Sequence, residues 1–240
     1  MLAIFKRDFR AYFTTPIGFV YLGGYILVLN LYFYLYNIAN VSTRSNSLAG
    51  IFSFMLMVMM FLTPILTMRI FSEEYRQKTD QLLFTSPVKL SGLVMGKFLA
   101  SLSIFFCLLL LSLLWPSAIA LIGQNNMAEV LGNYLGIITI GAAYIAMGIF
   151  ISSLTENQVI AAVGSLGLFV GLYLLEMLTA NLATALPGWA VTALRFVSIF
   201  GRYSDISMGL LALDDFVYFL SICAVFLFLT VRVLEKRRWS

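Results

Sequence analysis

The sequence contains no histidine, and this absence excludes several kinds of chemistry at once. A histidine general base, an HExxH zinc site, haem held by histidine and an intramembrane Ser-His dyad all need an imidazole. The GSLG stretch at residues 164–167 therefore cannot be the nucleophile motif of such a protease. The two cysteines, Cys107 and Cys223, each lie in an apolar run, which favours small packing residues over a disulfide or a metal site.

Charge is also scarce. Of 240 residues, 11% are charged and 61% are hydrophobic, and the mean hydropathy is +0.96, whereas about a quarter of the residues of a soluble domain are charged. Several uncharged runs reach the roughly 20 residues that a helix needs to cross the hydrocarbon core of a bilayer. The composition therefore predicts an all-α polytopic membrane protein.

We expect residues 1–240 to form a single transmembrane domain with six spans, at 17–36, 51–68, 98–121, 130–151, 159–178 and 216–231. Lys and Arg are enriched in the cytoplasmic segments of membrane proteins. With both termini in the cytoplasm, twelve of the fifteen basic residues fall inside, and three fall outside: Arg44, Arg195 and Arg202. This distribution predicts cytoplasmic termini.

Residues 1–15 have helical periodicity. Their apolar side chains fall on one face, namely Leu2, Phe5, Phe9, Tyr12 and Phe13, and their cations fall on the other, namely Lys6, Arg7 and Arg10. This pattern is typical of an amphipathic helix in the membrane interface, which the turn Thr14-Thr15-Pro16 would join to the first span. The alternative is a charged anchor that only sets the topology.

Residues 179–213, between the fifth and sixth spans, include two apolar pieces, LATALPGWAVTAL and ISMGLLAL. Such pieces are typical of re-entrant or interfacial half-helices, which must pack against protein or line a water-filled cavity. A seventh crossing at 182–194 is the alternative, but its shortness and its central Pro187-Gly188 argue against it.

The most distinctive feature is a charged segment, RIFSEEYRQKTDQLLFTSPVKL at residues 69–90, between two runs without charge. Each charge placed at the centre of a span costs about 2.5–3.5 kcal/mol, so this segment lies outside the hydrocarbon. We expect a helix at 72–85, with Ser72 as its N-cap and i,i+4 pairs Glu74–Lys78 and Arg76–Asp80. Pro87 would end it.

This helix would also carry an apolar stripe formed by Phe71, Tyr75, Leu82 and Leu83. An ordinary solvated loop helix does not need such a stripe. A helix that docks against lipid or against a partner protein does.

The segment resembles a motif of the type-2 ABC exporter permeases. The matching residues are Met68-Arg69-Ile70-Phe71, Glu73-Glu74, Arg76, Thr79, Leu82-Leu83, Thr85 and Pro87-Val88. The opening residues, MLAIFKRDFRAYFTTPIGFV, resemble the branch that contains the gliding-motility and nitrous-oxide-reductase-maturation permeases. In one departure, Lys78 stands where many relatives have glycine, which predicts a more continuous helix here.

The resemblance implies a permease subunit in a bacterial inner membrane, paired with an identical or different permease and driven by a separate cytoplasmic ATPase that binds ATP and Mg. A periplasmic or auxiliary subunit is compatible with it, and a nucleic-acid partner is not expected. The helix at 72–85 would couple to the ATPase through Phe71, Glu73, Glu74, Tyr75, Arg76, Lys78, Asp80, Leu82 and Leu83. Glu156 would make a second contact, and the 179–213 segments would close the exit.

The chain has no GxxxxGK[ST] motif, and GLVMGKF at 92–98 has the wrong spacing for one. We therefore expect no enzymatic activity, no cofactor and no metal site in this chain. An ATPase would be a different subunit.

Three further groups carry open interpretations. Tyr21, Tyr25 and Tyr32 share one face of the first span, either as a pathway wall or dimer seam or as packing with an aromatic belt. Gly167 and Gly171 suit close helix approach, within the subunit or at a seam. Glu176, near the outer end of the fifth span, is a candidate pathway residue.

Two other functions compete with export. A scaffold that transmits ATPase work to a periplasmic or surface machine would have the same architecture. An ion-coupled secondary carrier usually has ionisable residues near the middle of the membrane and internal repeats, and the sequence shows neither.

Overall fold

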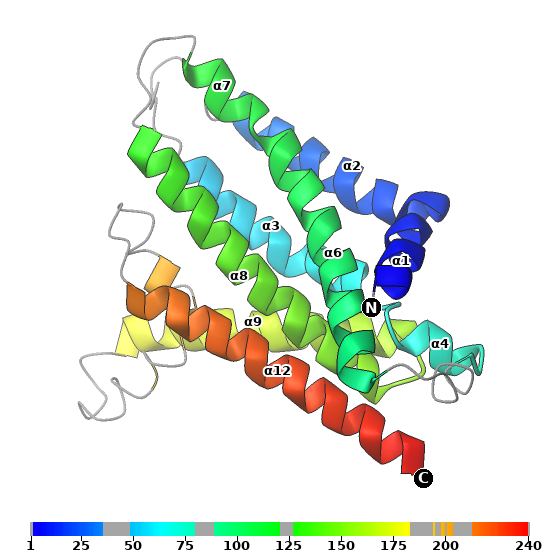
Figure 1. Cartoon of the computed structure of the whole chain (residues 1–240). Coiled ribbons are helices and arrows are strands. Elements are labelled where there is room, and N and C mark those ends of the chain that lie inside the picture. The colour runs from blue at the N-terminus through cyan, green and yellow to red at the C-terminus, as the bar shows by residue number, and fades with distance from the viewer. Residues whose placement is uncertain are drawn as a thin grey trace.

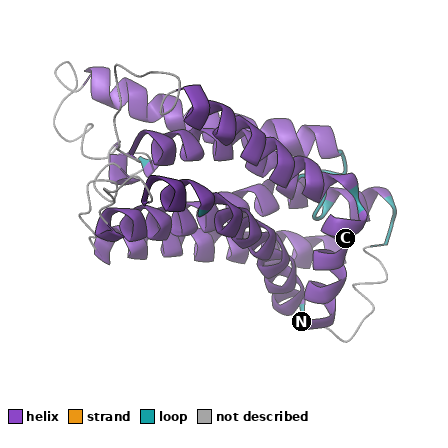
Figure 2. Cartoon of the chain, turned by 90° about the horizontal axis from the view of Figure 1, so that it is seen from above, coloured by secondary structure: helices purple, strands orange, loops and turns teal. Residues whose placement is uncertain are grey.

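The computed structural model describes residues 2–35, 49–79, 89–120, 127–182, 194, 198–199, 201–203 and 213–239. In this part of the chain every regular element is a helix (Figures 1 and 2). Six helices are long and apolar enough to cross a membrane. The predicted all-α, multi-pass architecture is therefore confirmed.

The helices are α1 Leu2–Thr14, α2 Pro16–Phe33, α3 Ala49–Thr67, α4 Ser72–Arg76, α6 Leu90–Ser112, α7 Leu114–Ala120, α8 Met127–Leu154, α9 Gln158–Leu182 and α12 Leu213–Trp239. The six candidate spans involve α2, α3, α6, α8, α9 and α12, in the predicted order. Two of these helices extend well beyond the predicted spans. Helix α6 begins at Leu90, and α12 continues through the basic tail to Trp239, because hydrogen bonding along a helix does not stop where the hydrocarbon ends.

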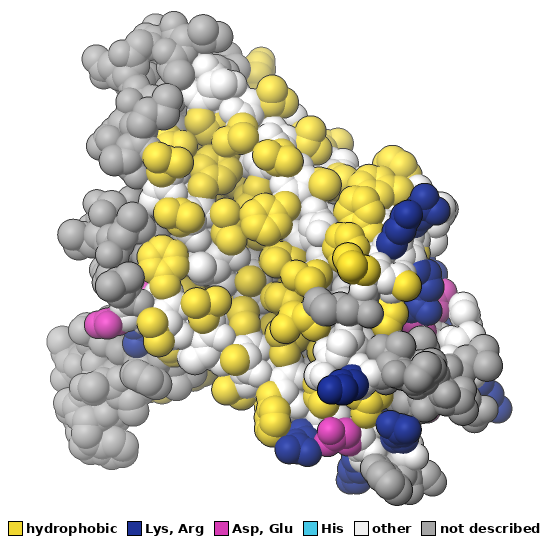
Figure 3. Space-filling model, in the orientation of Figure 1, with side chains coloured by type: hydrophobic (Ala, Val, Ile, Leu, Met, Phe, Trp, Pro, Cys, Tyr) yellow, Lys and Arg dark blue, Asp and Glu magenta, His cyan; other side chains and the backbone are white. Residues whose placement is uncertain are grey.

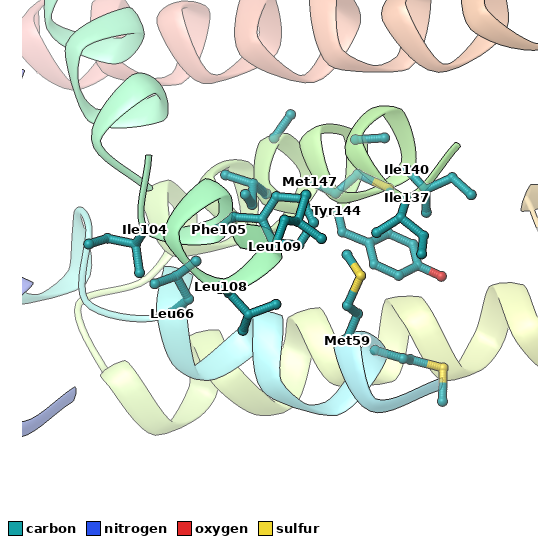
Figure 4. Packing of buried hydrophobic residues seen from close by; sticks show 14 of the residues in the cluster. Met59, Leu66, Ile104, Phe105, Leu108, Leu109, Ile137, Ile140, Tyr144 and Met147 are labelled. Carbon is teal, nitrogen blue, oxygen red and sulfur yellow. The ribbon is translucent and has the colours of Figure 1, made fainter. Parts of the chain in front are cut away.

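Helix α8 is the centre of the bundle. It packs against α3, α6, α9 and α12. Of the 18 residues in its most apolar stretch, 67% are buried, compared with 17% for the same stretch of α9 and 22% for those of α2 and α12. Figure 4 shows side chains of α8 meeting those of α3 and α6, among them Ile137, Tyr144, Phe105, Leu108 and Met59. The outer helices α2, α9 and α12 therefore carry much of the surface that would face lipid or a partner.

Two glycines let α8 approach its neighbours closely. A Cβ atom on Gly141 would lie 2.4 Å from the Phe105 ring, and one on Gly148 would lie 2.3 Å from Thr67 Oγ1. Among the described residues, none has an atom within 4 Å of a Cβ built on the predicted glycines Gly167 and Gly171. In the described part of the chain these two glycines therefore make no close helix approach, and of the two predicted roles the seam between subunits stays a prediction.

The corner between α1 and α2 forms as the sequence predicts. Thr15 is extended (φ −106°, ψ 152°), and Pro16 occupies the first turn of α2, where a missing N–H leaves no bond unmade. Both the backbone N–H and the hydroxyl of Thr15 donate to the Ala11 carbonyl, at 3.0 and 2.8 Å. The corner turns α1 away from the axis of α2 and back against α6.

Both ends of the chain lie at the same end of the bundle, beside α4 (Figure 1). Arg7 of α1 contacts Glu74 of α4, and the Arg237 guanidinium of α12 lies 3.9 Å from the centre of the Tyr75 ring. Charged side chains gather at this end, whereas hydrophobic side chains cover the middle of the same face (Figure 3). We call it the charged end.

The Gly148–Thr67 contact predicts that Gly148→Ala destabilises the bundle. The new methyl group must displace either a β-branched side chain or a helix, and such overpacking costs about 1–3 kcal/mol. Thermal unfolding of the detergent-purified protein measures the loss. Gly23→Ala is the matched control, because no described residue lies within 4 Å of the added atom. A similar loss in that variant would contradict the packing explanation.

Candidate functional site

The turn that leads into α4 is tied to the end of α8. Ser152 Oγ accepts hydrogen bonds from the backbone N–H groups of Phe71 (3.1 Å) and Ser72 (3.3 Å), and it donates to the Met68 carbonyl (3.1 Å). Ser72 is not the N-cap that the sequence predicts. Phe71 occupies that position, and the Ser72 hydroxyl instead donates to the Met68 carbonyl.

Helix α4 is shorter than the predicted helix at 72–85. It ends at Arg76, and Lys78 has φ 55°, in the left-handed region. The Lys78 N–H donates to the Tyr75 carbonyl (3.1 Å), and the Thr79 N–H donates to the Glu74 carbonyl (3.0 Å). These two bonds form a Schellman C-cap, a motif in which glycine usually takes the left-handed position. The expectation of a more continuous helix was therefore wrong, because Lys78 adopts the conformation that glycine favours.

The apolar side of α4 is turned into the protein. Phe71 and Tyr75 are buried, with 1% and 4% of their surface exposed, and their rings stack at 6.2 Å. On this helix and the following turn, the exposed residues are Arg76, Gln77 and Lys78. Three predicted coupling residues lie outside the described part of the chain: Asp80, Leu82 and Leu83.

Lys97, near the start of α6, is buried beneath α4 with 4% of its surface exposed. Its Nζ lies 2.8 Å from Glu74 Oε1 and 3.4 Å from Asp8 Oδ2, and it donates to the Ile70 carbonyl at 2.9 Å. A buried ammonium is tolerated only when counter-charges and hydrogen bonds replace its water. This single group therefore joins α1, α4 and α6.

Arg7 of α1 completes the cluster. Its guanidinium donates to Asp8 Oδ1 and to Glu74 Oε1, both at 2.7 Å. Burial alone would lower the pKa of Arg7, but the hydrogen bonds and charges of Asp8 and Glu74 outweigh that effect, and the pKa is raised. Among the described residues, Glu74 thus pairs with Arg7 and Lys97 rather than with Lys78, as the sequence had predicted. Glu73 pairs with Arg69.

Phe5, Phe9 and Tyr12, which the sequence predicts on the apolar face of α1, are partly buried against the protein. The Tyr12 hydroxyl donates to the Leu66 carbonyl (3.1 Å) and lies 3.0 Å from Ser101 Oγ, and burial raises the pKa of this phenol. The stacked rings of Phe5 and Phe9 are half-buried. The cations Lys6 and Arg10 are exposed.

A cavity of about 410 Å³ lies between α1, α4 and the start of α6. We call it the α1–α4 cavity. Its charged lining consists of Arg7, Asp8, Arg69, Glu73, Glu74 and Lys97, and its less polar lining includes Ala11, Tyr12 and Ile17.

Glu156, the predicted second contact, lies in the short turn between α8 and α9. The Arg237 guanidinium approaches its carboxylate at 3.5 Å while it covers the Tyr75 ring. Glu156 is therefore at the charged end, close to α4, with 65% of its side chain exposed.

The three tyrosines of α2 pack within the subunit. Tyr21 and Tyr25 have no exposed surface, and the Tyr25 hydroxyl donates to the Met55 carbonyl at 2.9 Å. The Tyr32 ring stacks on Phe54 at 4.2 Å. A seam between subunits would need exposed surface, so the packing interpretation replaces the seam interpretation for Tyr21 and Tyr25.

Glu176 is at the opposite end of the bundle from α4. Its carboxylate lies close to Gly201, where an added Cβ would come within 2.9 Å of Oε1. Nearby residues form a second polar group, with Arg202 donating to Asp215 (2.8 Å) and Tyr203 donating to Asn133 (2.8 Å). Most of the predicted re-entrant region, residues 179–213, lies outside the described part of the chain.

The residues that the sequence interpretation missed are Asp8, Lys97, Ser152 and Arg237. Asp8 is the one acid among the cations of residues 1–15, and Lys97 directly precedes a long uncharged run. Each of these positions is unusual enough in the sequence to indicate that its charge has a partner in the fold. Nothing local distinguishes Ser152 or Arg237.

In the comparison with protein families, the family described as "ABC-2 family transporter protein" matches residues 26–232, which is most of the chain. No curated protein matches the sequence.

The buried Lys97 predicts that Glu74→Gln destabilises the protein by about 3 kcal/mol, because removing one partner of a buried pair leaves a charge uncompensated. Adding Lys97→Met should recover much of this loss, because the unpaired ammonium is then absent. Thermal unfolding of the two single variants and the double variant measures the coupling. Glu235→Gln, in an exposed pair with Arg232, is the control, and strictly additive losses for Glu74 and Lys97 would refute the pairing.

The left-handed Lys78 predicts that Lys78→Gly stabilises the protein by about 1 kcal/mol, since glycine adopts this conformation without a Cβ penalty. Lys78→Ala is the matched control, because it removes the same charge and keeps the Cβ atom. Equal melting temperatures for the glycine and alanine variants would show that the backbone at this position is not strained.

Proposed function

The chain belongs to the ABC-2 family of transporter proteins, and from this premise we propose that it is an export-type permease subunit powered by a separate cytoplasmic ATPase. The family membership indicates the transmembrane subunit of an ABC transporter. ATP and Mg would be bound by the partner. The charged end would receive the mechanical work.

The observation that carries this proposal is the attachment of α4 to the rest of the protein. Glu74 joins α4 to α1 through Arg7 and to α6 through Lys97. Ser152 joins the preceding turn to α8. A displacement of α4 would therefore move several helices together, which is what a coupling helix must achieve.

The geometry divides the predicted coupling residues into two groups. Arg76 and Lys78 are exposed and would contact the ATPase. Phe71, Glu74 and Tyr75 are turned inward and would transmit the movement. Glu156, held near Tyr75 by Arg237, would make the second contact with the partner.

The proposed orientation in the membrane follows from the residues at the charged end. Both termini lie there (Figure 1), and Lys and Arg side chains gather there on the face that Figure 3 shows. We therefore place the charged end in the cytoplasm of a bacterium, at its inner membrane. Helix α1 would lie in the membrane interface, with Lys6 and Arg10 toward headgroups.

Transport would be carried out by two permeases, identical or different. Helix α9 offers a surface for this pairing, because Val159, Val163 and Leu174 are exposed along it and Gly167 lies in open space. The segments between α9 and α12 would close the exit on the outer side, where Glu176 lies.

The test is a charge reversal at the exposed surface, Arg76→Glu with Lys78→Glu. We expect these changes to abolish co-purification of a stoichiometric P-loop ATPase, identified by mass spectrometry, while the permease remains folded in detergent. Lys236→Glu with Arg238→Glu reverses the same number of exposed charges on α12 and should retain the ATPase. Retention in both double variants, or the absence of any ATPase with the wild type, would contradict the coupling role.

A further inference from the structure

The α1–α4 cavity combines charged and less polar walls at the point where α1 meets the first span. Its lining includes Lys97 and Glu74, and it extends past Ala11 to Ile17, in the first turn of α2. Its volume of about 410 Å³ falls within the range of about 300–1,000 Å³ typical of small-molecule sites. The apolar side chains of Ala11, Ile17 and Ile70 thus line the same cavity as the charged groups, a combination that suits an amphiphilic molecule.

The charges of the lining are balanced. Three cations, Arg7, Arg69 and Lys97, accompany three carboxylates: Asp8, Glu73 and Glu74. A simple anion would meet the carboxylates as well as the cations. A zwitterion, with a phosphate and an ammonium group, could pair with both.

The cavity offers an acceptor for the ammonium half of such a ligand and donors for its phosphate half. Asp8 Oδ2 is buried and accepts no hydrogen bond from the described residues, although Lys97 Nζ lies 3.4 Å away. A guanidinium has five N–H donors, and the bonds of Arg7 to Asp8 and Glu74 use its Nε and Nη2 atoms. A primary ammonium could donate to Asp8, and a phosphate could accept from Arg7.

We propose that the α1–α4 cavity binds a phosphoethanolamine group, presented by a phospholipid of the surrounding bilayer. Ala11 and Ile17 would contact the glycerol end of the lipid. The proposal depends on the placement of α1 in the membrane interface, and it does not require an ATPase. The bound headgroup would fill the space between α1 and α4 and so hold the two elements together.

The experiment measures the melting temperature of the delipidated chain, residues 1–240, in detergent. Dioleoyl-phosphatidylethanolamine, at about 100 times its dissociation constant, should raise the melting temperature by roughly 5 °C or more. The corresponding phosphatidylcholine lacks N–H donors, and phosphatidylglycerol lacks the ammonium, so each should raise it less. Equal shifts with all three lipids would overturn the proposal.

Ala11→Phe places a ring in the cavity without removing a charge and should abolish the phosphatidylethanolamine shift. Ala3→Phe, on an exposed part of α1 away from the cavity lining, is the matched control and should retain it. A shift that survives in Ala11→Phe would overturn the site. If that variant does not fold, the proposal is judged by the order of the melting-temperature shifts that the three lipids give with the wild type.

A measurement with free O-phosphoethanolamine distinguishes a headgroup presented by a phospholipid from the soluble molecule. A small shift compared with that of the lipid supports the bilayer source, and an equal shift would overturn it. Because the permease is tested alone, a negative result leaves the ATPase coupling to be judged by its own experiment.

Discussion

Lys97 has 4% of its surface exposed, and its ammonium group is surrounded by protein partners. Desolvating such a charge is costly unless carboxylates and carbonyl groups compensate for it. Asp8 comes from α1, Glu74 from α4 and the Ile70 carbonyl from the turn between α3 and α4. The arrangement of the charged end depends on keeping these three elements around one lysine.

This constraint explains why a five-residue helix can occupy a defined position. Helix α4 is too short to be stable alone, since isolated helices of fewer than about 12 residues are marginal. Its position comes from the buried rings of Phe71 and Tyr75, from the bonds of Ser152 and from Glu74. We expect an element held in this way to move together with its neighbours, and this property would suit the proposed transfer of movement from a cytoplasmic partner to the membrane helices.

The features that sequence reasoning predicted correctly are local. Hydropathy determines whether a helix can span the membrane, and Thr15-Pro16 specifies a corner through dihedral angles of adjacent residues. The features it missed depend on distant partners. Local spacing matched Glu74 with Lys78, whereas the fold brings Arg7 and Lys97 to the same carboxylate. The end of α4 was missed because Lys78 adopts a conformation that residue type alone disfavours.

The central claim is that Glu74 and Lys97 remain paired inside the permease while the neighbouring exposed turn contacts an ATPase. A cryo-electron microscopy structure of the complex purified from native membranes tests it most directly. The account predicts Arg76 and Lys78 at the contact with the ATPase, and the Lys97 ammonium still on Glu74. An ATPase bound away from α4, or Lys97 exposed to solvent in the complex, would contradict it.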